Sequence, residues 1–296
     1  MDRRDALGFL AAAGGALALP AIAQGPNLAR SIPATGEKLP AIGLGTWLTF
    51  DVTSAADRAA RGEVMRAFFE GGGHMVDSSP MYGASEETIG AALPANGRTM
   101  FSATKVWTVG ALAGRRQLEN SYRLWKLQRF DLLQVHNFLD WETHLATLRQ
   151  MKADARVRYV GVTTSHGRRH DLAEKILREE RIDFIQFTYN VNDLSAEPLF
   201  AIARERGVAV IVNRPFDGGN VFGAKTARPL PGWGAELGCR TWAEALLKFV
   251  LSQAAVTCAI PATSQLAHLR ENMRALEGPV PDARMRARIA ADYARA

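Results

Sequence analysis

The chain contains only two cysteines among its 296 residues, Cys239 and Cys258. Their spacing fits neither a set of metal ligands nor a disulfide framework, which argues against zinc binding and against thiol redox chemistry. We therefore treat both thiols as structural and predict no metal site.

The apolar run near the N-terminus, residues 7–19, is shorter than the about 20 residues that a membrane-spanning helix needs. The paired Arg3 and Arg4 precede it, and residues 21–23 (Ala-Ile-Ala) offer a cleavage site of the A-x-A type. An amphipathic N-terminal helix is a weaker alternative because no polar face interrupts the run. We predict that residues 1–24 are a cleavable twin-arginine signal peptide, with export by the twin-arginine machinery, a periplasmic location and no stable membrane insertion.

The chain has no concentrated block of basic residues, although its formal net charge is +6 and its pI is near 9.6. Lys and Arg are scattered, and the densest basic run, RMRAR at residues 284–288, is expected to be the solvated face of a helix. A nucleic-acid-binding function would rest on net charge alone and is not predicted. A basic balance also suits a phosphate-bearing small molecule.

No predicted strand is followed by a G-x-G-x-x-G turn, which weakens the case for an open, doubly wound dinucleotide-binding sheet. Instead, eight short apolar runs, each bounded by turn residues, alternate with amphipathic segments and are typical of buried parallel strands. The runs are residues 41–47, 74–79, 100–106, 132–138, 159–165, 184–190, 208–215 and 256–263. We predict an α/β fold, a single-domain (β/α)8 TIM barrel over residues 31–290 that follows the signal segment.

The stretch VDSSPMYGASEETIG, residues 76–90, places Asp77 at the end of the second run and Tyr82 in the loop after it. Lys105 lies at the end of the third run and His136 at the end of the fourth. Taken singly, each has an ordinary structural explanation. In a parallel barrel, however, the carboxyl ends of neighbouring strands meet at one rim, so all four are predicted to share a site.

These four side chains suit the acid half of a carbonyl reduction. A phenol has a pKa of about 10 and is a weak acid at neutral pH, but a nearby lysine favours its anion. Asp77 pairs with Lys105 and fixes its orientation. Tyr82 can then give a proton to a carbonyl oxygen, and a neutral His136 can hold the same oxygen as a hydrogen-bond donor. Because no side chain donates hydride, a nicotinamide cofactor is required.

From about residue 31 to residue 276 the sequence resembles the aldo-keto reductase family. The resemblance is carried by GLGTW, VDSSPMYG, ATK, VHN, YVGVTTS, IQFTYN and IPATSQLAHLREN, in the order that the family has them. It implies that Asp77, Tyr82, Lys105 and His136 are the catalytic tetrad. It also implies an oxidoreductase that interconverts an aldehyde or ketone and the corresponding alcohol.

The resemblance further implies a set of cofactor contacts. The expected residues are Gly45, Thr46, Trp47, Thr163, Thr164, Gln186, Asn213, Arg214, Thr263, Gln265 and Asn272. Asn213 stands where many members have an aromatic ring that stacks on the nicotinamide. The resemblance implies NADP as the cofactor. NAD is an open alternative, because Ala262 and His268 replace a Lys and an Arg that are common in members preferring NADP.

Two further expectations concern partners. Trp47, Trp107, Phe138 and Trp141 lie near strand ends and could wall an apolar pocket for a small carbonyl or alcohol substrate. Because nicotinamide nucleotides are made in the cytoplasm, an exported enzyme would recycle a retained cofactor with a second substrate or a redox partner. The alternative function is a nucleotide-retaining sensor or regulatory subunit on the same barrel, against which the complete tetrad argues.

Overall fold

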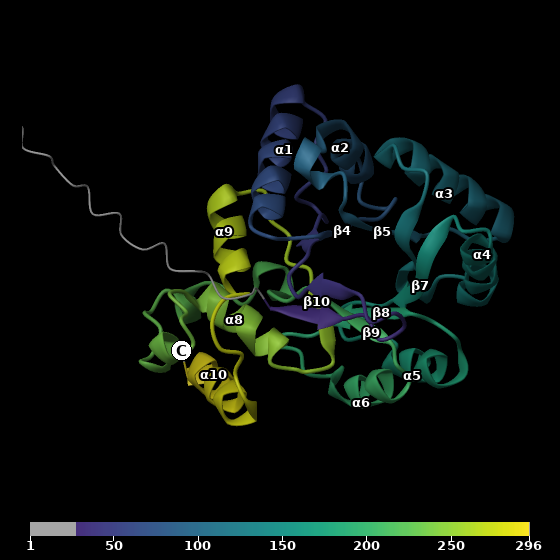
Figure 1. Ribbon diagram of the computed structural model, residues 1–296. Helices are drawn as coiled ribbons and strands as arrows, with labels where there is room; N and C mark the ends of the chain where they lie inside the picture. Colours follow the sequence, from purple (N-terminus) through teal and green to yellow (C-terminus); the bar gives the residue numbers. More distant parts are fainter. Residues whose placement is uncertain (1–27, 296) are drawn as a thin grey trace, which may run out of the picture.

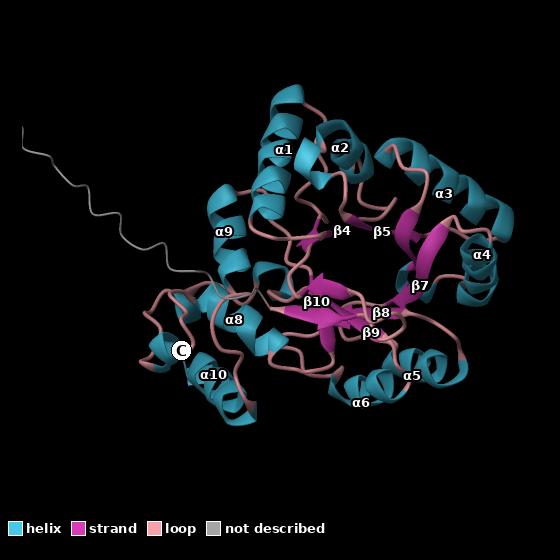
Figure 2. Cartoon of the chain, viewed as in Figure 1, coloured by secondary structure: helices cyan, strands magenta, loops and turns pink. Residues whose placement is uncertain are grey.

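The computed structural model describes residues 28–295, so the predicted signal peptide at residues 1–24 lies outside the described residues. The described chain forms a parallel eight-stranded sheet rolled into a barrel, with helices around its outside (Figures 1 and 2). This confirms the predicted α/β barrel, and the predicted strand and helix alternation follows the chain order.

All eight predicted strands are present, and each pairs in parallel with the strand beside it in sequence. The strands are β3 (Leu44–Gly45), β4 (Met75–Asp77), β5 (Phe101–Val106), β6 (Phe130–Val135), β7 (Val157–Thr163), β8 (Phe184–Thr188), β9 (Ala209–Asn213) and β10 (Val256–Ala259). Parallel bridges from Ile42 to Ala259 and from Gly45 to Ala262 join the first strand to the last. The barrel is closed by these contacts.

The first and last strands approach each other closely at Gly45. A Cβ atom at this position would lie 2.6 Å from the carbonyl oxygen of Ile260, so only glycine allows the first and last strands to approach this closely. Of the strand predicted at residues 41–47, Leu44 and Gly45 form the ladder with β4, and single bridges at Ile42 and Gly45 join it to the last strand.

The helices lie outside the strands, as Figure 2 shows. They are α1 (Ala55–Glu70), α2 (Ser85–Ala92), α3 (Ala111–Trp125), α4 (Trp141–Ala153), α5 (His170–Glu179), α6 (Glu197–Glu205), α7 (Trp233–Glu236), α8 (Trp242–Leu251), α9 (Leu266–Arg274) and α10 (Ala283–Arg295), with 3-10 turns at Ala95–Gly97, His136–Phe138, Asp217–Gly219 and Ala224–Thr226. Ser54 caps the first helix, because the backbone N–H of Asp57 donates to its Oγ over 3.0 Å. Among residues 28–295, no helix is long and apolar enough to cross a membrane.

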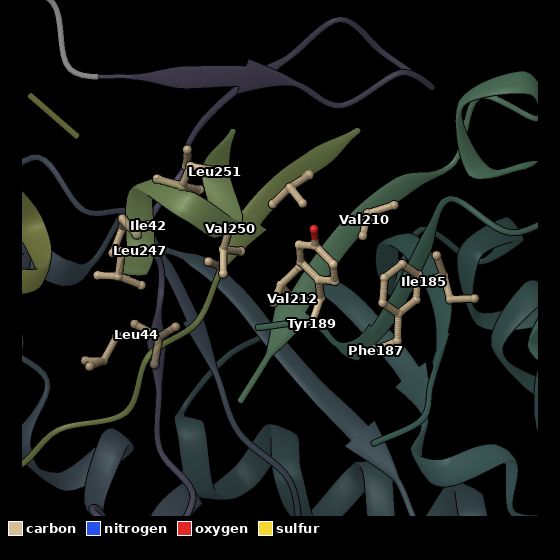
Figure 3. Close-up of a cluster of buried hydrophobic side chains, with 14 of the residues drawn as sticks. Ile42, Leu44, Ile185, Phe187, Tyr189, Val210, Val212, Leu247, Val250 and Leu251 are labelled. Carbon is tan, nitrogen blue, oxygen red and sulfur yellow. The ribbon is translucent and has the colours of Figure 1, made fainter. Parts of the chain in front are cut away.

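The apolar core has two layers separated by the strands. The outer layer lies between strands and helices, and Figure 3 shows part of it, where Val210 and Val212 of β9 share a cluster with Leu247 and Val250 of α8. The inner layer fills the barrel with strand side chains such as Phe101 and contains Ile32 and Leu39. Both faces of the strands are therefore buried, which explains why their sequences are continuous apolar runs.

Ile32 and Leu39 belong to a segment that the sequence did not predict. Strands β1 (Ala29–Ser31) and β2 (Lys38–Pro40) form an antiparallel hairpin, and both apolar side chains are fully buried in the inner cluster. They share this cluster with Met75 and Phe101, which are the first residues of β4 and β5 and pair with each other. The hairpin thus covers the end of the barrel where the strands begin, and the opposite rim is free for chemistry.

The basic run at residues 284–288 lies in α10. Arg284 and Arg288 are exposed, which agrees with a solvated face, while Ile289 and Tyr293 on the same helix are buried. The Tyr293 hydroxyl donates to the carbonyl oxygen of Val221 over 3.2 Å. The helix is therefore amphipathic and packs against the barrel.

Candidate active site

The carboxyl ends of three neighbouring strands bring the four predicted catalytic residues together. Asp77 is the last residue of β4, Lys105 is the next to last of β5, and His136 follows β6 directly. Tyr82 lies in the loop between β4 and α2. Strands β4, β5 and β6 are adjacent in the sheet, so their ends meet at one rim.

A buried ion pair forms the base of the site. Nζ of Lys105 donates to Oδ2 of Asp77 over 2.5 Å and to the carbonyl oxygen of Ser78 over 2.7 Å. Lys105 is fully buried and Asp77 is 1% exposed. Burial opposes the charge on Lys105, but the attraction of Asp77 and other nearby acidic groups outweighs it, and the pKa of Lys105 is raised.

Asp77 is held on its other side by two glutamines. Gln134 donates to Oδ1 of Asp77 over 3.1 Å, and Gln186 donates to the same oxygen over 3.3 Å. The hydroxyl of Thr46 donates to the backbone carbonyl oxygen of Asp77 over 2.9 Å. These donors and Lys105 fix the carboxylate in position.

Tyr82 lies beside the ammonium group of Lys105, whose Nζ is 5.2 Å from the centre of the phenol ring. Gly83 follows with φ of +58°, and a Cβ atom there would overlap the carboxylate of Asp51, which accepts from the backbone N–H of Ala84 over 2.8 Å. Glycine therefore allows the tight turn that positions the preceding tyrosine.

The protonation of Tyr82 differs from the sequence-based expectation. Burial raises the pKa of Tyr82, and the lowering effect of Lys105 only partly opposes it. The expected net lowering is therefore wrong for this site, because removal of the phenol from water outweighs the nearby cation. The side chain is a neutral phenol at neutral pH, which is the form that can donate a proton.

His136 is neutral in this environment. Burial, followed by repulsion from Lys105, lowers its pKa well below the ordinary value. Its ring meets that of Tyr82 edge to face, with 5.7 Å between centroids, and its Nδ1 lies 2.8 Å from Oγ of Ser79. The prediction of a neutral imidazole agrees with these surroundings, whereas the contact with Ser79 was not predicted.

A second buried carboxylate, Glu86, was also missed. In the first turn of α2, Glu86 is 1% exposed and accepts bonds from Thr104 over 2.6 Å, Ser121 over 2.9 Å and Trp125 over 3.1 Å. Burial raises its pKa, and these bonds and the charge of Lys105 oppose the rise. Glu86 thus ties the helix that follows Tyr82 to β5 and α3. A charged residue inside an otherwise apolar helix face is the signal that could have found it.

A cavity of about 350 Å³ opens above the tetrad. Of the predicted site residues, it is lined by Gly45, Thr46, Trp47, Asp77, Tyr82, His136, Thr163, Gln186, Asn213 and Arg214. Lys105 lies beneath it, in contact with Asp77. Among residues 28–295, no group of three or more His, Cys, Asp or Glu could hold a metal ion.

Asn213 joins a polar network on one wall of the cavity. Its Nδ2 donates to the carbonyl oxygen of Thr164 over 2.9 Å and to Oε1 of Gln186 over 3.3 Å, and its Oδ1 accepts from Thr188 over 2.7 Å. This network explains how Thr164 is tied to the site without lining the cavity. It also gives the wall an amide edge at Asn213 where an aromatic face is usual in the family that the sequence resembles.

Arg214 supplies the positive charge of the cavity wall. Its guanidinium lies 5.8 Å from the centre of the Trp47 ring and pairs with Asp217 over 3.1 Å, while its Nε is buried without a partner among the described residues. A guanidinium with an unused N–H beside a cavity fits an anionic group such as a phosphate. The donor set of this wall therefore suits a nucleotide.

Three predicted cofactor residues lie away from the cavity. Thr263 and Gln265 precede α9, where the backbone N–H of Gln265 donates to Oγ1 of Thr263 over 3.1 Å, and Asn272 is buried within α9. Arg274, on the same helix, is engaged with Glu244, 2.6 Å from Nε to Oε1.

His268 and Arg270 are the exposed candidates for charge on α9, whereas Ala262 lines the cavity. The segment from Ala262 to the end of α9 therefore presents few cations to a ligand.

Comparisons with solved structures agree with the barrel fold. A holo aldo-keto reductase from Bacillus halodurans superposes with a TM-score of 0.76 at 20% identity, over 90% of this chain and 96% of the other. An aldo-keto reductase from Klebsiella pneumoniae in complex with NADPH gives 0.74 at 23% identity, over 87% and 92%. A thermostable aldo-keto reductase in complex with the inhibitor epalrestat gives 0.74 at 25% identity, over 90% and 99%. Comparison with curated proteins gives no match.

The sequence itself supplies the family. The sequence model of the aldo/keto reductase family matches residues 41–291, which is most of the chain and includes all eight barrel strands. The predicted resemblance is therefore confirmed, and with it an enzyme of the oxidoreductase class. The chain belongs to the aldo/keto reductase family.

Proposed function

We propose that the protein reduces an aldehyde or ketone to the alcohol, or catalyses the reverse oxidation, with NADP(H) and with Tyr82 as the proton donor and acceptor. The observation that carries the proposal is the buried Lys105, 2.5 Å from Asp77 and 5.2 Å from the Tyr82 ring, at the floor of a cavity. This buried cation is held by the carboxylate of Asp77 and the carbonyl oxygen of Ser78, and it lies beside the phenol of Tyr82. Its position suits stabilisation of a transient phenolate.

In the reduction, Tyr82 donates its proton to the carbonyl oxygen as negative charge grows there. Lys105 stabilises the phenolate that forms, and Asp77 holds Lys105 in place and offsets its charge. Neutral His136 donates a second hydrogen bond to the same oxygen. The side chains of the site account for the proton and the charge but not for the hydride.

A bound nicotinamide supplies that hydride. The residues that fit it are on the cavity wall: the amides of Gln186 and Asn213 suit a carboxamide, and Arg214 with its unpartnered Nε suits a phosphate. Solved aldo-keto reductases with NADPH or NADP share the fold, which supports NADP(H) as the cofactor here. NAD is the alternative, because Ala262 and His268 provide no fixed positive charge.

The cavity rim favours substrates with an apolar group next to the carbonyl. Trp47, Leu48, Met81 and Phe222 line the cavity, and their side chains are 39%, 68%, 37% and 43% exposed. Exposed apolar side chains gathered at a pocket mouth mark a ligand-binding surface. Aromatic and alkyl aldehydes or ketones are therefore better candidates than sugars.

The location of the protein is part of the proposal. The pairing of Arg3 and Arg4 with a following apolar run supports export by the twin-arginine route into the periplasm. That route carries folded proteins, so the cofactor would travel bound. The bound nicotinamide would then be recycled by a second substrate or a redox partner.

The activity is tested by following NADPH oxidation at 340 nm with a panel of aromatic, alkyl and sugar carbonyls. We expect turnover with apolar carbonyls and saturable binding of NADPH to the purified protein. Nucleotide binding without turnover of any carbonyl or alcohol would instead support the sensor or regulatory function.

A further inference from the structure

Ser79 lies directly behind the imidazole that faces the cavity. It is fully buried in the loop after β4, and its Oγ is 2.8 Å from Nδ1 of His136. His136 follows β6, so this bond joins the ends of β4 and β6 across the intervening β5. It is the one hydrogen bond that the His136 ring makes with a described side chain.

The proton on this bond can be assigned from the partners of Ser79. Oγ of Ser79 accepts from the backbone N–H of Met81 over 3.3 Å, and its only other contact is Nδ1 of His136. A hydroxyl has one proton and two lone pairs. Among the described residues, Nδ1 is therefore the only acceptor for the Ser79 proton, and full burial removes water as a substitute.

The two tautomers of His136 are unequal for this reason. If Nδ1 carried the proton, it would donate to Ser79, and the buried hydroxyl proton would have no acceptor, which costs on the order of tenfold in population or more. If Nε2 carries the proton, Ser79 donates to Nδ1 and every group on this side is satisfied. The neutral state of the ring makes one of these two forms obligatory.

We propose that Ser79 is a positioning residue, which holds His136 in the tautomer with its proton on Nε2, facing the cavity. This rests on the proposed function, in which His136 donates a hydrogen bond to the carbonyl oxygen. The opposite tautomer would turn a lone pair toward the oxygen and repel it. Ser79 thus selects the donor form before substrate binds.

The groups that face His136 from the packed elements are consistent with this assignment. Tyr82 meets the ring edge to face from the β4–α2 loop, and Lys105 acts on it from β5 as a like charge. Neither group bonds to the imidazole. The direction of the ring proton therefore depends on Ser79.

The direct test is the tautomer itself. Protein labelled with nitrogen-15 in its six histidines is measured at pH 7 by long-range proton–nitrogen correlation, with His136→Asn used to assign the signals. We expect Nδ1 of His136 to be unprotonated and Nε2 protonated, in at least about tenfold excess. A proton mainly on Nδ1, or a doubly protonated ring, overturns the proposal.

Variants separate positioning from packing. In Ser79→Ala the excess of the Nε2–H form should fall below about threefold, and kcat/KM for the carbonyl about tenfold, with nucleotide affinity unchanged. The acidic limb of the pH profile should move to higher pH, because loss of a bond made only by the neutral ring raises the pKa of His136. Ser79→Thr, which retains the hydroxyl, should restore all three.

Ser102→Ala is the matched control, because it also deletes a buried hydroxyl, 3.0 Å from Asp131, at the start of β5. It should leave the tautomer and the pH profile unchanged. If Ser79→Ala retains the tenfold excess, the proposal is wrong even if activity falls. If Ser79→Ala does not fold, Ser79→Cys, a weaker donor of similar size, replaces it.

The proposed function and the role of Ser79 can fail independently, because turnover and the tautomer of His136 are measured separately. A wild-type protein that turns over no carbonyl or alcohol contradicts the oxidoreductase proposal. The tautomer of His136 in the same sample still decides whether Ser79 acts as inferred.

Discussion

Nζ of Lys105 lies 2.5 Å from Oδ2 of Asp77, with both side chains removed from solvent. A buried ion pair is weak evidence for stability, because desolvation of both ions offsets their attraction. Removal of one partner, in contrast, leaves an uncompensated buried charge. Loss of one partner should therefore lower both the free energy of unfolding and the activity, and single and double variants of the pair can separate the two effects.

We predict that Lys105→Met alone destabilises the protein by about 3 to 5 kcal/mol, because Asp77 is left buried and unpaired. The double variant Asp77→Asn with Lys105→Met should recover most of this loss, since no charge remains. Neither variant should regain activity. Urea unfolding and NADPH oxidation measure the two effects, and a double variant as unstable as the single one contradicts the assignment of the cost to Asp77.

The pH dependence of stability provides a second prediction. The pKa of His136 is lowered in the folded state, so the unfolded chain binds this proton more readily. Stability from this group is therefore present above the ordinary histidine pKa of about 6.5 and is lost as pH falls below it, at up to about 1.4 kcal/mol per pH unit. The variant His136→Gln should show a shallower loss between pH 6.5 and 5.

His268→Gln is the control for that measurement, because His268 is exposed. Its stability should follow that of the wild type over the same pH range. A wild type and a His136→Gln variant with the same pH slope would contradict the neutral buried imidazole.

The discrimination between NADP and NAD should be modest. Charge-assisted hydrogen bonds contribute about 1.5 to 3 kcal/mol each, and Ala262 and His268 supply none with a permanent charge. Calorimetric titration should show a preference for NADP of less than about a hundredfold. Ala262→Lys should strengthen NADP binding about tenfold and leave NAD binding unchanged.

Another cation of α9 would raise the preference for NADP if it bound the phosphate. Arg274 is occupied by Glu244, which leaves exposed Arg270 as the first candidate for a replacement contact. A thousandfold preference for NADP, abolished by Arg270→Ala, would show that this residue supplies the phosphate site.

The buried carboxylate of Glu86 should matter for stability through its three donors. Glu86→Ala removes the acceptor of Thr104 and Trp125 in a buried place and leaves Ser121 only the carbonyl oxygen of Gln117, so we expect a loss of about 3 kcal/mol. Glu86→Gln retains an acceptor oxygen and should lose less. Thermal unfolding of both variants measures the two stability losses. Equal losses would show that the lost hydrogen bonds do not cause the destabilisation.

Export is tested by fractionating cells that produce the wild type or the double variant Arg3→Lys, Arg4→Lys. The wild type should be found in the periplasm, processed near residue 23, and the variant should accumulate unprocessed in the cytoplasm. An undiminished periplasmic amount of the variant excludes the twin-arginine route. A mass spectrum of nucleotide released from the periplasmic protein tests cofactor retention separately.

The strand ends were predictable, and the groups that support them were not. Asp77, Lys105 and His136 could be placed at one rim because each closes a recognisable apolar run, and runs of this kind become adjacent parallel strands. Ser79 and Glu86 act through contacts with residues 57 and 35 positions away, His136 and Ser121. A charged residue on an apolar helix face could have marked Glu86 itself, but no local pattern identifies the distant partner of either residue.

Two other departures have local causes. The hairpin of β1 and β2 is too short for a visible alternation, so its buried Ile32 and Leu39 were not expected to fill the barrel. The net pKa of Tyr82 depends on how completely the phenol leaves water, which the order of residues does not determine. The nearby charge of Lys105, considered without burial, therefore gave the wrong direction for the pKa shift of Tyr82.

The most direct test of the account is Tyr82→Phe, assayed for carbonyl-dependent NADPH oxidation. The change removes only the hydroxyl, and the ring can still pack beside Lys105 and His136. We expect kcat to fall at least about a hundredfold, as for a lost general acid, and the dissociation constant for NADPH to stay within about twofold. A Tyr82→Phe enzyme that reduces a good substrate at close to the wild-type rate would contradict it.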